Sequence, residues 1–190
     1  MIGVFGGSFD PIHHGHLLVA QAVREALALD EVRFVPARQQ PFKAGLPSTP
    51  SVVRARMVAA AIEGDAAFRL ERLELERAGP SYTIDTLRAL HRREPGKRWA
   101  LMLGADAARD LPLWREAEEL HRLADLVVFA RAGTEAPELP WPVRRVTVPA
   151  MEISATQIRR RAAAGQSLRY WVPDPVVEVI RAEGLYLKDA

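Results

Sequence analysis

The sequence contains no cysteine among its 190 residues. This absence excludes a disulfide framework, a cysteine-ligated zinc site and a thiol nucleophile, and it is typical of proteins from reducing compartments. The sequence also has no apolar run close to the roughly 20 residues that a membrane-spanning helix needs, and its first residues do not resemble a secretory signal. We therefore expect a soluble protein that is located in the cytoplasm and has no membrane partner.

An excess of charge of one sign is also lacking. The 26 Lys and Arg residues are nearly balanced by 24 Asp and Glu, which gives a formal net charge of +2. The basic residues are mostly arginines interleaved with acids, and the densest cluster, Arg159 to Arg161, is typical of a solvated helix face. This balance argues against nucleic acid as a partner. The sequence leaves the oligomeric state open, with a homo-oligomer among the alternatives.

The hydrophobic content of 48% is sufficient for one sizeable core, so we expect a single domain over residues 1–190. Short apolar runs predict strands at residues 1–5, 32–35, 68–75, 99–103, 126–130 and 143–148. Helical periodicity predicts helices at about 15–29, 51–62, 83–93, with Ser81 or Thr83 as the cap, and 114–123. This alternation predicts an α/β fold: a Rossmann-like open, mostly parallel sheet with helices on both faces, followed by a helical C-terminal segment from about residue 154.

The first predicted loop has the unusual sequence GGSFDPIHHGH, residues 6–16, which holds three of the five histidines in the chain. Gly6 and Gly7 allow the backbone to approach a ligand closely and to adopt positive φ. The helix that follows would present free N–H groups and the positive end of its dipole. The loop therefore favours a phosphate group, although it matches neither the dinucleotide-binding G-x-G-x-x-G nor a P-loop.

His13 and His16 are three residues apart, so both can face one anion from the first turn of a helix. Imidazole groups next to a phosphate can donate hydrogen bonds to charge that develops during group transfer. The alternatives are two histidines that cap a helix or lie in the core, and a zinc site. A zinc site is disfavoured because H-x-x-H lacks the Glu and the further ligand of the helical zinc motifs.

A second polar group of residues, ISATQIR at 153–159, follows the last predicted strand. Ser154 fits the N-cap of a helix, Thr156 offers a hydroxyl in the first turn, and Arg159 lies on the same edge. Two hydroxyls and an arginine at a helix N-terminus suit a polyphosphate. Taken alone, the segment also fits an ordinary capped helix.

These two segments resemble the two signatures of the H-x-G-H nucleotidyltransferase superfamily: GSFDP with H-x-G-H, and I-S-x-T-x-x-R. Within it, PFK at 41–43, PSYTIDTL at 80–87, GAD at 104–106, Trp114 and VVFARAG at 127–133 resemble the bacterial nicotinate-nucleotide adenylyltransferases. The resemblance extends from residue 6 to the WVP segment at 171–173. Ala155 and Phe42 depart from the family's usual Ser and His, which affects individual contacts only.

The resemblance implies transfer of AMP from ATP to the 5′-phosphate of nicotinate mononucleotide, which yields nicotinate adenine dinucleotide and pyrophosphate in NAD biosynthesis. Enzymes of this family act by direct in-line displacement, with Mg²⁺ on the triphosphate and no covalent enzyme intermediate. The alternatives are a nicotinamide-mononucleotide or pantetheine-phosphate adenylyltransferase, which differ in the acceptor, and a nucleotide sensor without catalytic activity.

The resemblance also implies roles for individual residues. The catalytic group would be His13, His16 and Arg159. ATP would be bound by Gly6, Gly7, Ser8, Phe9, Gly104, Asp106, Ser154, Thr156 and Arg159. The acceptor nucleotide would contact Lys43, Tyr82, Thr83, Trp114 and Arg131. No residue is assigned as a metal ligand.

Overall fold

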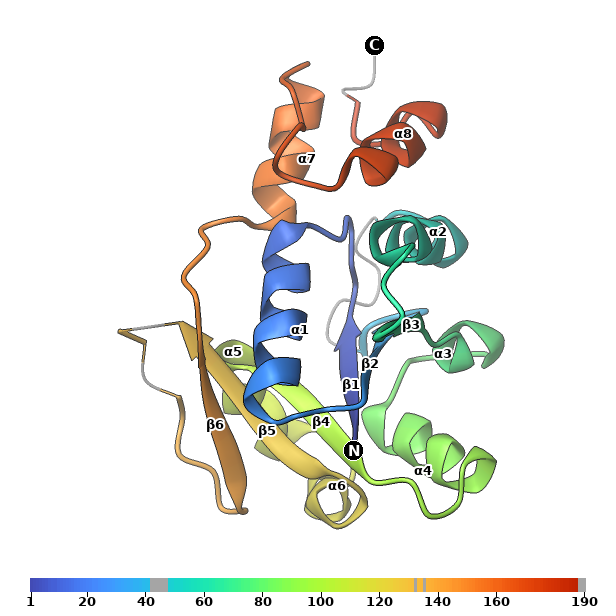
Figure 1. Cartoon of the computed structure of the whole chain (residues 1–190). Coiled ribbons are helices and arrows are strands. Elements are labelled where there is room, and N and C mark those ends of the chain that lie inside the picture. Colours follow the sequence, from blue (N-terminus) through green and yellow to red (C-terminus); the bar gives the residue numbers. More distant parts are fainter. Residues whose placement is uncertain (42–47, 132, 135, 188–190) are drawn as a thin grey trace.

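The computed structural model describes residues 1–41, 48–131, 133–134 and 136–187. Over these residues one sheet of six parallel strands forms the centre of the molecule, in the order β3-β2-β1-β4-β5-β6 (Figure 1). The strands are β1 (Ile2–Gly7), β2 (Glu31–Pro36), β3 (Phe68–Leu70), β4 (Trp99–Gly104), β5 (Asp125–Arg131) and β6 (Val143–Val148). The predicted fold class is confirmed. The strand order reverses between β1 and β4, and such a reversal is where open α/β sheets bind ligands.

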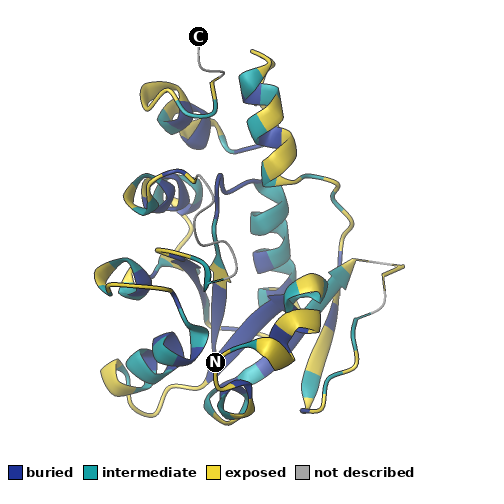
Figure 2. Ribbon diagram, turned by 180° about the vertical axis from the view of Figure 1, so that it is seen from behind, coloured by how far each residue is buried: buried dark blue, intermediate teal, exposed yellow. Residues whose placement is uncertain are grey.

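Side chains alternate between the two faces of the sheet along each central strand, because successive side chains of a strand point in opposite directions. In β1, Val4 belongs to one buried cluster and Phe5 to the other. Leu101 and Met102 of β4 divide in the same way. Both faces are therefore apolar and need helices to cover them, and Figure 2 shows the buried strands enclosed by helices with exposed outer surfaces.

The helices divide between these two faces. They are α1 (His14–Ala26), α2 (Ser51–Ile62), α3 (Leu73–Glu76), α4 (Thr83–Arg93), α5 (Ala105–Asp110), α6 (Ala117–Leu123), α7 (Ala155–Ala163) and α8 (Asp174–Ala182). The apolar cluster around Phe5 includes residues of α1, α2, α7 and α8, whereas the cluster around Val4 includes residues of α4, α5 and α6. Figure 1 shows α7 and α8 beyond the carboxyl end of β1. Within the described ranges, no helix has both the length and the apolar character needed to cross a bilayer.

The predicted strand at residues 68–75 is wrong in its second half, because β3 ends at Leu70 and α3 follows. The reason is the buried carboxylate of Glu71. It accepts hydrogen bonds from the backbone N–H groups of Arg72, at 2.9 Å, and Leu73, at 3.3 Å, which turn the chain out of the sheet. A glutamate in an alternating pattern gave no indication of this turn.

The helix predicted at 114–123 begins only at Ala117, and the prediction missed α5 and the short 3₁₀ helix η2 (Leu111–Leu113) before it. Glu116 lies in the left-handed region, with φ of 52°, and this conformation separates η2 from α6. The short helix α5 starts directly at the end of β4, where the sequence pattern predicts only a loop.

Two helix ends also differ from the prediction. The cap of α4 is Tyr82, without a side-chain capping bond, and the Oγ of Ser81 instead accepts the backbone N–H of Arg38 at 2.9 Å. Helix α1 ends at Ala26 rather than near residue 29, since Ala28 has a φ of 48°. The helices predicted at 51–62 and after Ser154 are confirmed. The last helix, α8, begins at a Pro-Asp-Pro triplet, with Pro173 as its N-cap.

Candidate active site

A cavity of about 830 Å³ opens where the chain leaves the carboxyl ends of β1 and β2. Three parts of the chain meet there: the loop after β1 with the start of α1, the segments on either side of residues 42–47, and the first turns of α7. The lining residues are Ser8, Phe9, Asp10, His16, Ala37, Arg38, Gln39, Gln40, Ser48, Thr49, Pro50, Ser51, Arg54, Ala155, Thr156 and Arg159. The two segments that the sequence predicts to bind phosphate therefore share one cavity, although 149 positions separate Asp10 from Arg159.

The glycines of the first loop act differently from the prediction. Strand β1 continues through Gly6 and Gly7, and neither has positive φ; the left-handed residue is Phe9, with φ of 48°. A Cβ at Gly7 would lie 2.9 Å from the buried ring of Phe9, so this glycine provides the space for that ring. A Cβ at Gly6 would have no described atom within 4 Å, which leaves its backbone open to close approach.

His16 lines the cavity and lies in the first turn of α1. Its ring packs edge-on against Phe9, with ring centroids 5.1 Å apart. The backbone N–H of His13 donates to Nδ1 of His16 at 3.3 Å. Since Nδ1 accepts this bond, the neutral ring carries its proton on Nε2 and can donate there. Burial, reinforced by the neighbouring His13, holds the pKa of His16 well below its usual value of 6.5.

His13 is the N-cap residue of α1 and is buried, and its ring stacks on that of His16 with centroids 3.7 Å apart. Burial, with a smaller contribution from His14, lowers the pKa of His13 to about 4. Its Nδ1 is buried and has no hydrogen-bond partner within the described part of the chain. A Cβ at Gly15 would lie 3.0 Å from this Nδ1, so the glycine of H-x-G-H makes room for the His13 ring.

The second segment forms the capped helix start that the sequence predicts. The Oγ of Ser154 accepts the backbone N–H of Gln157 at 3.2 Å, and the Gln157 side chain accepts the backbone N–H of Ser154 at 2.9 Å. Arg159 donates to the backbone carbonyl of Asp10 at 2.8 Å and to Oγ1 of Thr156 at 3.2 Å. A guanidinium group and a hydroxyl are thus directed into the cavity from the positive end of α7.

Sequence reasoning missed Arg54, which also lines the cavity. This arginine of α2 is buried, and it donates to the backbone carbonyl groups of Ser8, Ala37 and Thr49. One side chain therefore holds the loops after β1 and β2 and the start of α2 in fixed positions around the cavity. The sequence signal that could have identified Arg54 was its position in a predicted helix, on the same face as the apolar residues Met57 and Val58. All three side chains are buried.

Gly104 and Asp106 lie outside the lining of this cavity. Gly104 ends β4, the neighbour of β1 at the point where the strand order reverses, and a Cβ there would lie 3.3 Å from the Phe129 ring. The Asp106 side chain is 98% exposed and forms an ion pair with Arg109 at 2.9 Å. Asp106 is therefore free to reorient toward a ligand that lies at this edge of the sheet.

Four of the predicted acceptor residues, Tyr82, Thr83, Trp114 and Arg131, also lie outside the lining of the cavity. Tyr82 caps α4, and the guanidinium group of Arg115 stacks on its ring at 4.9 Å. Thr83 is the first residue of α4, and Trp114 is half-buried against the apolar cluster that contains Val4. Arg131 is exposed at the end of β5. Lys43 lies outside the described residues.

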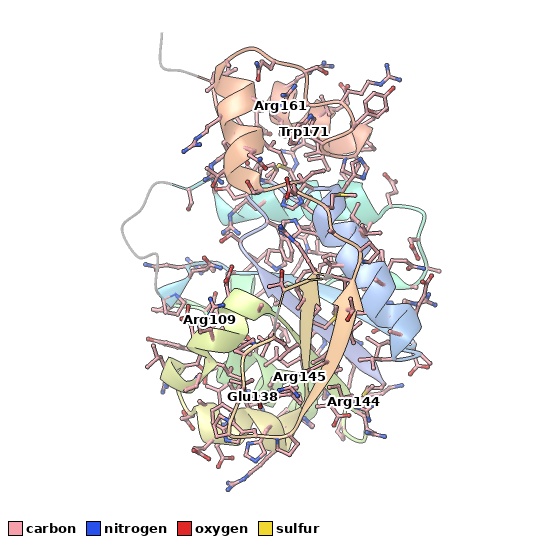
Figure 3. The ribbon with its side chains drawn as sticks, turned by 90° about the vertical axis from the view of Figure 1, so that its left-hand side faces the viewer. Arg109, Glu138, Arg144, Arg145, Arg161 and Trp171 are labelled. Carbon is pink, nitrogen blue, oxygen red and sulfur yellow. The ribbon has the colours of Figure 1, made fainter. Side chains whose placement is uncertain are left out.

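Charged side chains outside the cavity are distributed over the molecule. Figure 3 shows Arg109, Arg145 and Arg161 on separate parts of the surface. Arg145 is paired with Glu138 at 3.1 Å, and Arg161 stacks on Trp171 at 4.7 Å. Among the described residues, no group of three or more His, Cys, Asp and Glu side chains could hold a metal ion.

Residues 4–161 of the chain match the family described as cytidylyltransferase-like. A Thermus thermophilus protein named "Probable nicotinate-nucleotide adenylyltransferase" is 49% identical, over 97% of this chain and 98% of its own length. A protein of the same name from Thermomicrobium roseum is 41% identical over 97% and 91% of the two chains. The structure of Plasmodium falciparum nicotinic acid mononucleotide adenylyltransferase complexed with NaAD has a TM-score of 0.80 at 21% identity, over 97% of this chain and 96% of that one, which shows a common fold. This chain therefore belongs to the nicotinate-nucleotide adenylyltransferase family.

Proposed function

We propose that this chain transfers AMP from ATP to nicotinate mononucleotide and so forms nicotinate adenine dinucleotide and pyrophosphate. The observation that carries the proposal is the convergence of His16, the Ser8–Phe9 loop and Arg159 on one cavity. Hydrogen-bond donors line it from a loop, a helix start and a guanidinium group, as a triphosphate requires. Family membership supports the same reaction.

In this proposal the triphosphate occupies the cavity. The backbone N–H groups of Ser8 and Phe9 bind phosphate oxygens, and Gly6 lets the ligand approach the chain. Thr156 and Arg159, with Ser154 at the helix start, hold the β- and γ-phosphates. His16 donates from Nε2 to the α-phosphoryl oxygens. His13 is the second catalytic histidine, and its ring stacks on that of His16.

The reaction needs no enzyme nucleophile. An oxygen of the acceptor's 5′-phosphate attacks the α-phosphorus in line, a new P–O bond forms, and the bond from the α-phosphorus to the bridging oxygen breaks. Both electrons of that bond leave with pyrophosphate. The acceptor phosphate is already an anion at neutral pH, so no base has to remove a proton from it. The chain contributes positioning and stabilisation of charge on the transferring and leaving groups.

Adenosine and acceptor would extend from the cavity toward β4. Gly104 and Asp106 lie at the edge where the strand order reverses, which suits binding of the adenosine ribose through the Asp106 carboxylate. The N-terminus of α4 at Thr83 can supply N–H donors to the nicotinate carboxylate, and Trp114 offers an aromatic face for the pyridine ring. Arg131 and Lys43 are proposed as further acceptor contacts.

We propose that Mg²⁺ enters together with ATP, because the described residues offer no carboxylate cluster for it. Asp10 is the cavity carboxylate, and both of its oxygens accept hydrogen bonds from the chain itself. When bound to the triphosphate, the ion would reduce the negative charge of the phosphate groups. The side chains named above need only bind and orient the nucleotide.

The test is pyrophosphate release by the purified protein with ATP and Mg²⁺, in parallel reactions with nicotinate mononucleotide, nicotinamide mononucleotide and 4′-phosphopantetheine. We expect release with the nicotinate acceptor to exceed the others by at least about tenfold, which corresponds to one well-placed hydrogen bond or charge contact. A preference for another acceptor would support the transfer of AMP from ATP but contradict nicotinate mononucleotide as the acceptor. Binding of ATP without release for any acceptor would instead favour a nucleotide sensor.

A further inference from the structure

The chain after α8 folds back toward the active site. Helix α8 ends in a left-handed turn at Gly184, with φ of 58°, and the backbone N–H of Leu185 donates to the carbonyl of Ile180 at 3.0 Å. This bond pattern is the Schellman motif, which reverses the direction of the chain after a helix. Tyr186 follows, also with positive φ, at 63°. Tyr186 lies outside the family signatures described above, and these signatures therefore give it no function.

The Tyr186 hydroxyl reaches the loop that follows β1. It donates to Oδ1 of Asp10 at 2.6 Å, and it accepts the hydroxyl of Thr49 at 3.3 Å. The second carboxylate oxygen of Asp10 accepts the backbone N–H of Thr49 at 3.2 Å. Asp10 is buried and lines the cavity, so the tyrosine holds a carboxylate of the candidate active site from behind.

Asp10 in turn holds Arg159. The backbone carbonyl of Asp10 accepts a hydrogen bond from the Arg159 guanidinium group at 2.8 Å, and the same group reaches Thr156. The orientation of Arg159 therefore depends on the position of the Asp10 backbone, and that position is fixed through the Asp10 side chain by Tyr186 and Thr49. Burial, together with the hydrogen bond to Asp10, raises the pKa of Tyr186, so its hydroxyl remains a donor at neutral pH.

We propose that Tyr186 is a positioning residue that orients Arg159 toward the triphosphate through Asp10. This inference rests on the proposed function in so far as Arg159 is taken as a phosphate ligand. Removing the hydroxyl should release the Asp10 backbone and let Arg159 adopt other orientations. The loss should affect the binding of ATP and the stabilisation of leaving pyrophosphate, and should leave the acceptor nucleotide unaffected.

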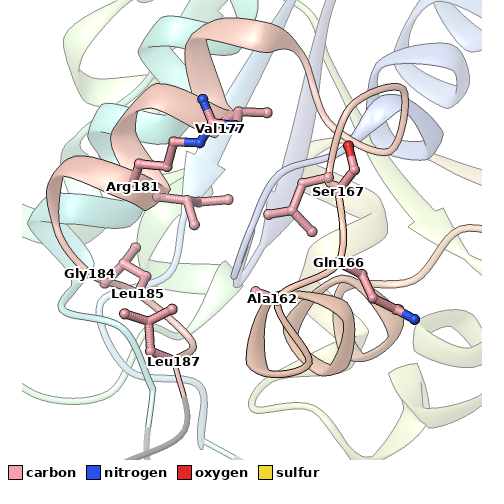
Figure 4. Close-up of a pocket in the computed structure, with 11 residues that line it drawn as sticks. Ala162, Gln166, Ser167, Val177, Arg181, Gly184, Leu185 and Leu187 are labelled. Atoms are coloured by element: carbon pink, nitrogen blue, oxygen red, sulfur yellow. The ribbon is translucent and has the colours of Figure 1, made fainter.

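The backbone of this segment is held independently of the hydroxyl by the hydrogen bond from Leu185 to the carbonyl of Ile180. Leu185 and Leu187 line a second cavity, of about 470 Å³, between α7 and α8 (Figure 4). Leu185 and Tyr186 also contact the apolar cluster around Phe5. A Tyr186→Phe variant keeps the ring and these apolar contacts, so we expect it to fold as the unchanged protein does.

The experiment compares Tyr186→Phe with Tyr170→Phe. Tyr170 is a matched control, since it also has positive φ, of 69°, and is 77% exposed. Tyr186→Phe should raise the KM for ATP by about tenfold and lower kcat by a similar factor, the order expected when a hydrogen bond to a charged group is lost. The KM for the acceptor should stay within about twofold, and Tyr170→Phe should match the unchanged protein. Equal ATP parameters for both variants would overturn the proposal.

A binding measurement separates this inference from the acceptor assignment. The affinity for a non-hydrolysable ATP analogue needs no acceptor, and Tyr186→Phe should weaken it by about tenfold. If the unchanged protein used a different acceptor, this weakening would still support the role of Tyr186. Unweakened binding would overturn that role, and a protein without affinity for the analogue would overturn both proposals.

A double-mutant cycle tests the path through Asp10. Because Tyr186 acts through the Asp10 carboxylate, Tyr186→Phe should have no further effect on analogue affinity in an Asp10→Ala background. An additional tenfold loss in that background would show that the tyrosine acts by another route and would contradict the proposal.

Discussion

The imidazole rings of His13 and His16 stack face to face, with centroids 3.7 Å apart and an angle of 26° between their planes. Two cationic rings at this separation would repel each other strongly in a buried site. Burial lowers both pKa values, so the pair is neutral at physiological pH. In the proposed function, this neutral pair would donate to the triphosphate through N–H groups without binding the pyrophosphate product as tightly as two cations would.

His16→Ala should lower kcat by about 100- to 1,000-fold, as expected when a donor to a charge-bearing transition state is removed. The fold should remain intact, since the ring lies at the cavity and not in the centre of the core. His14→Ala is the control, because His14 belongs to the same helix turn but does not line the cavity. Steady-state rates and circular dichroism test the prediction, and a His16→Ala enzyme with unchanged kcat would contradict it.

The stability of the protein should fall as the pH decreases from 6.5 toward 4. His13 has a pKa of about 4 in the folded protein and 6.5 as the reference value, so in this range the unfolded chain binds a proton that the folded chain does not. Protonation of His13 therefore favours unfolding. Its destabilising effect on the folded protein is absent above pH 6.5 and complete below pH 4. The expected loss between pH 7.5 and 5 is about 2 kcal/mol.

Urea unfolding of the unchanged protein and of His13→Gln at both pH values measures this effect. His13→Gln removes the titrating group, so the difference in unfolding free energy between the two pH values should shrink by the same amount. The comparison is unaffected by any loss of stability that the substitution causes at both pH values. An identical pH dependence in the two proteins would show that His13 titrates normally.

Gly6→Ala and Gly3→Ala should affect different properties, although both glycines lie in β1: the first should change the KM for ATP, and the second should change stability. A Cβ at Gly6 would project into open space, so the fold should tolerate it while the KM for ATP rises by about tenfold if the backbone approaches the ligand there. A Cβ at Gly3 would lie 3.0 Å from Leu29 and Met102. That variant should lose about 1–3 kcal/mol of stability from overpacking and keep its KM for ATP. Melting temperatures and KM values together decide between these outcomes.

Ser154 combines a capping role with a proposed contact to the triphosphate. Ser154→Ala loses the capping bond to Gln157 and should destabilise the protein by about 1 kcal/mol. Ser154→Asp keeps a good N-cap but adds a negative charge next to the phosphates, so it should retain stability and raise the KM for ATP. A Ser154→Asp variant with normal ATP affinity would place the triphosphate away from this helix start.

Local patterns were sufficient to predict much of the secondary structure. Alternating strands and helices gave the parallel sheet, and Ser154 marked a helix start, because apolar periodicity and capping involve residues close together in the sequence. The prediction was wrong where a distant contact redirected the chain. The Glu71 carboxylate, which turns the chain out of the sheet, accepts a hydrogen bond from Arg33, 38 positions earlier in the chain. The hydroxyl of Ser81 accepts a bond from Arg38, 43 positions earlier, instead of capping α4.

The sequence by itself determined the fold class, the family and the two segments that carry the candidate site, since each depends on residue types at short spacing. Only the tertiary structure decided that His16 and Arg159 share one cavity, that Arg54 holds its loops, and that Tyr186 bonds to Asp10 across 176 positions of the chain. Such contacts depend on where the packed sheet and helices bring distant backbone groups together. A buried polar group forms a hydrogen bond with whichever partner the packing places within reach. The spacing of residues in the sequence therefore does not predict which partner that is.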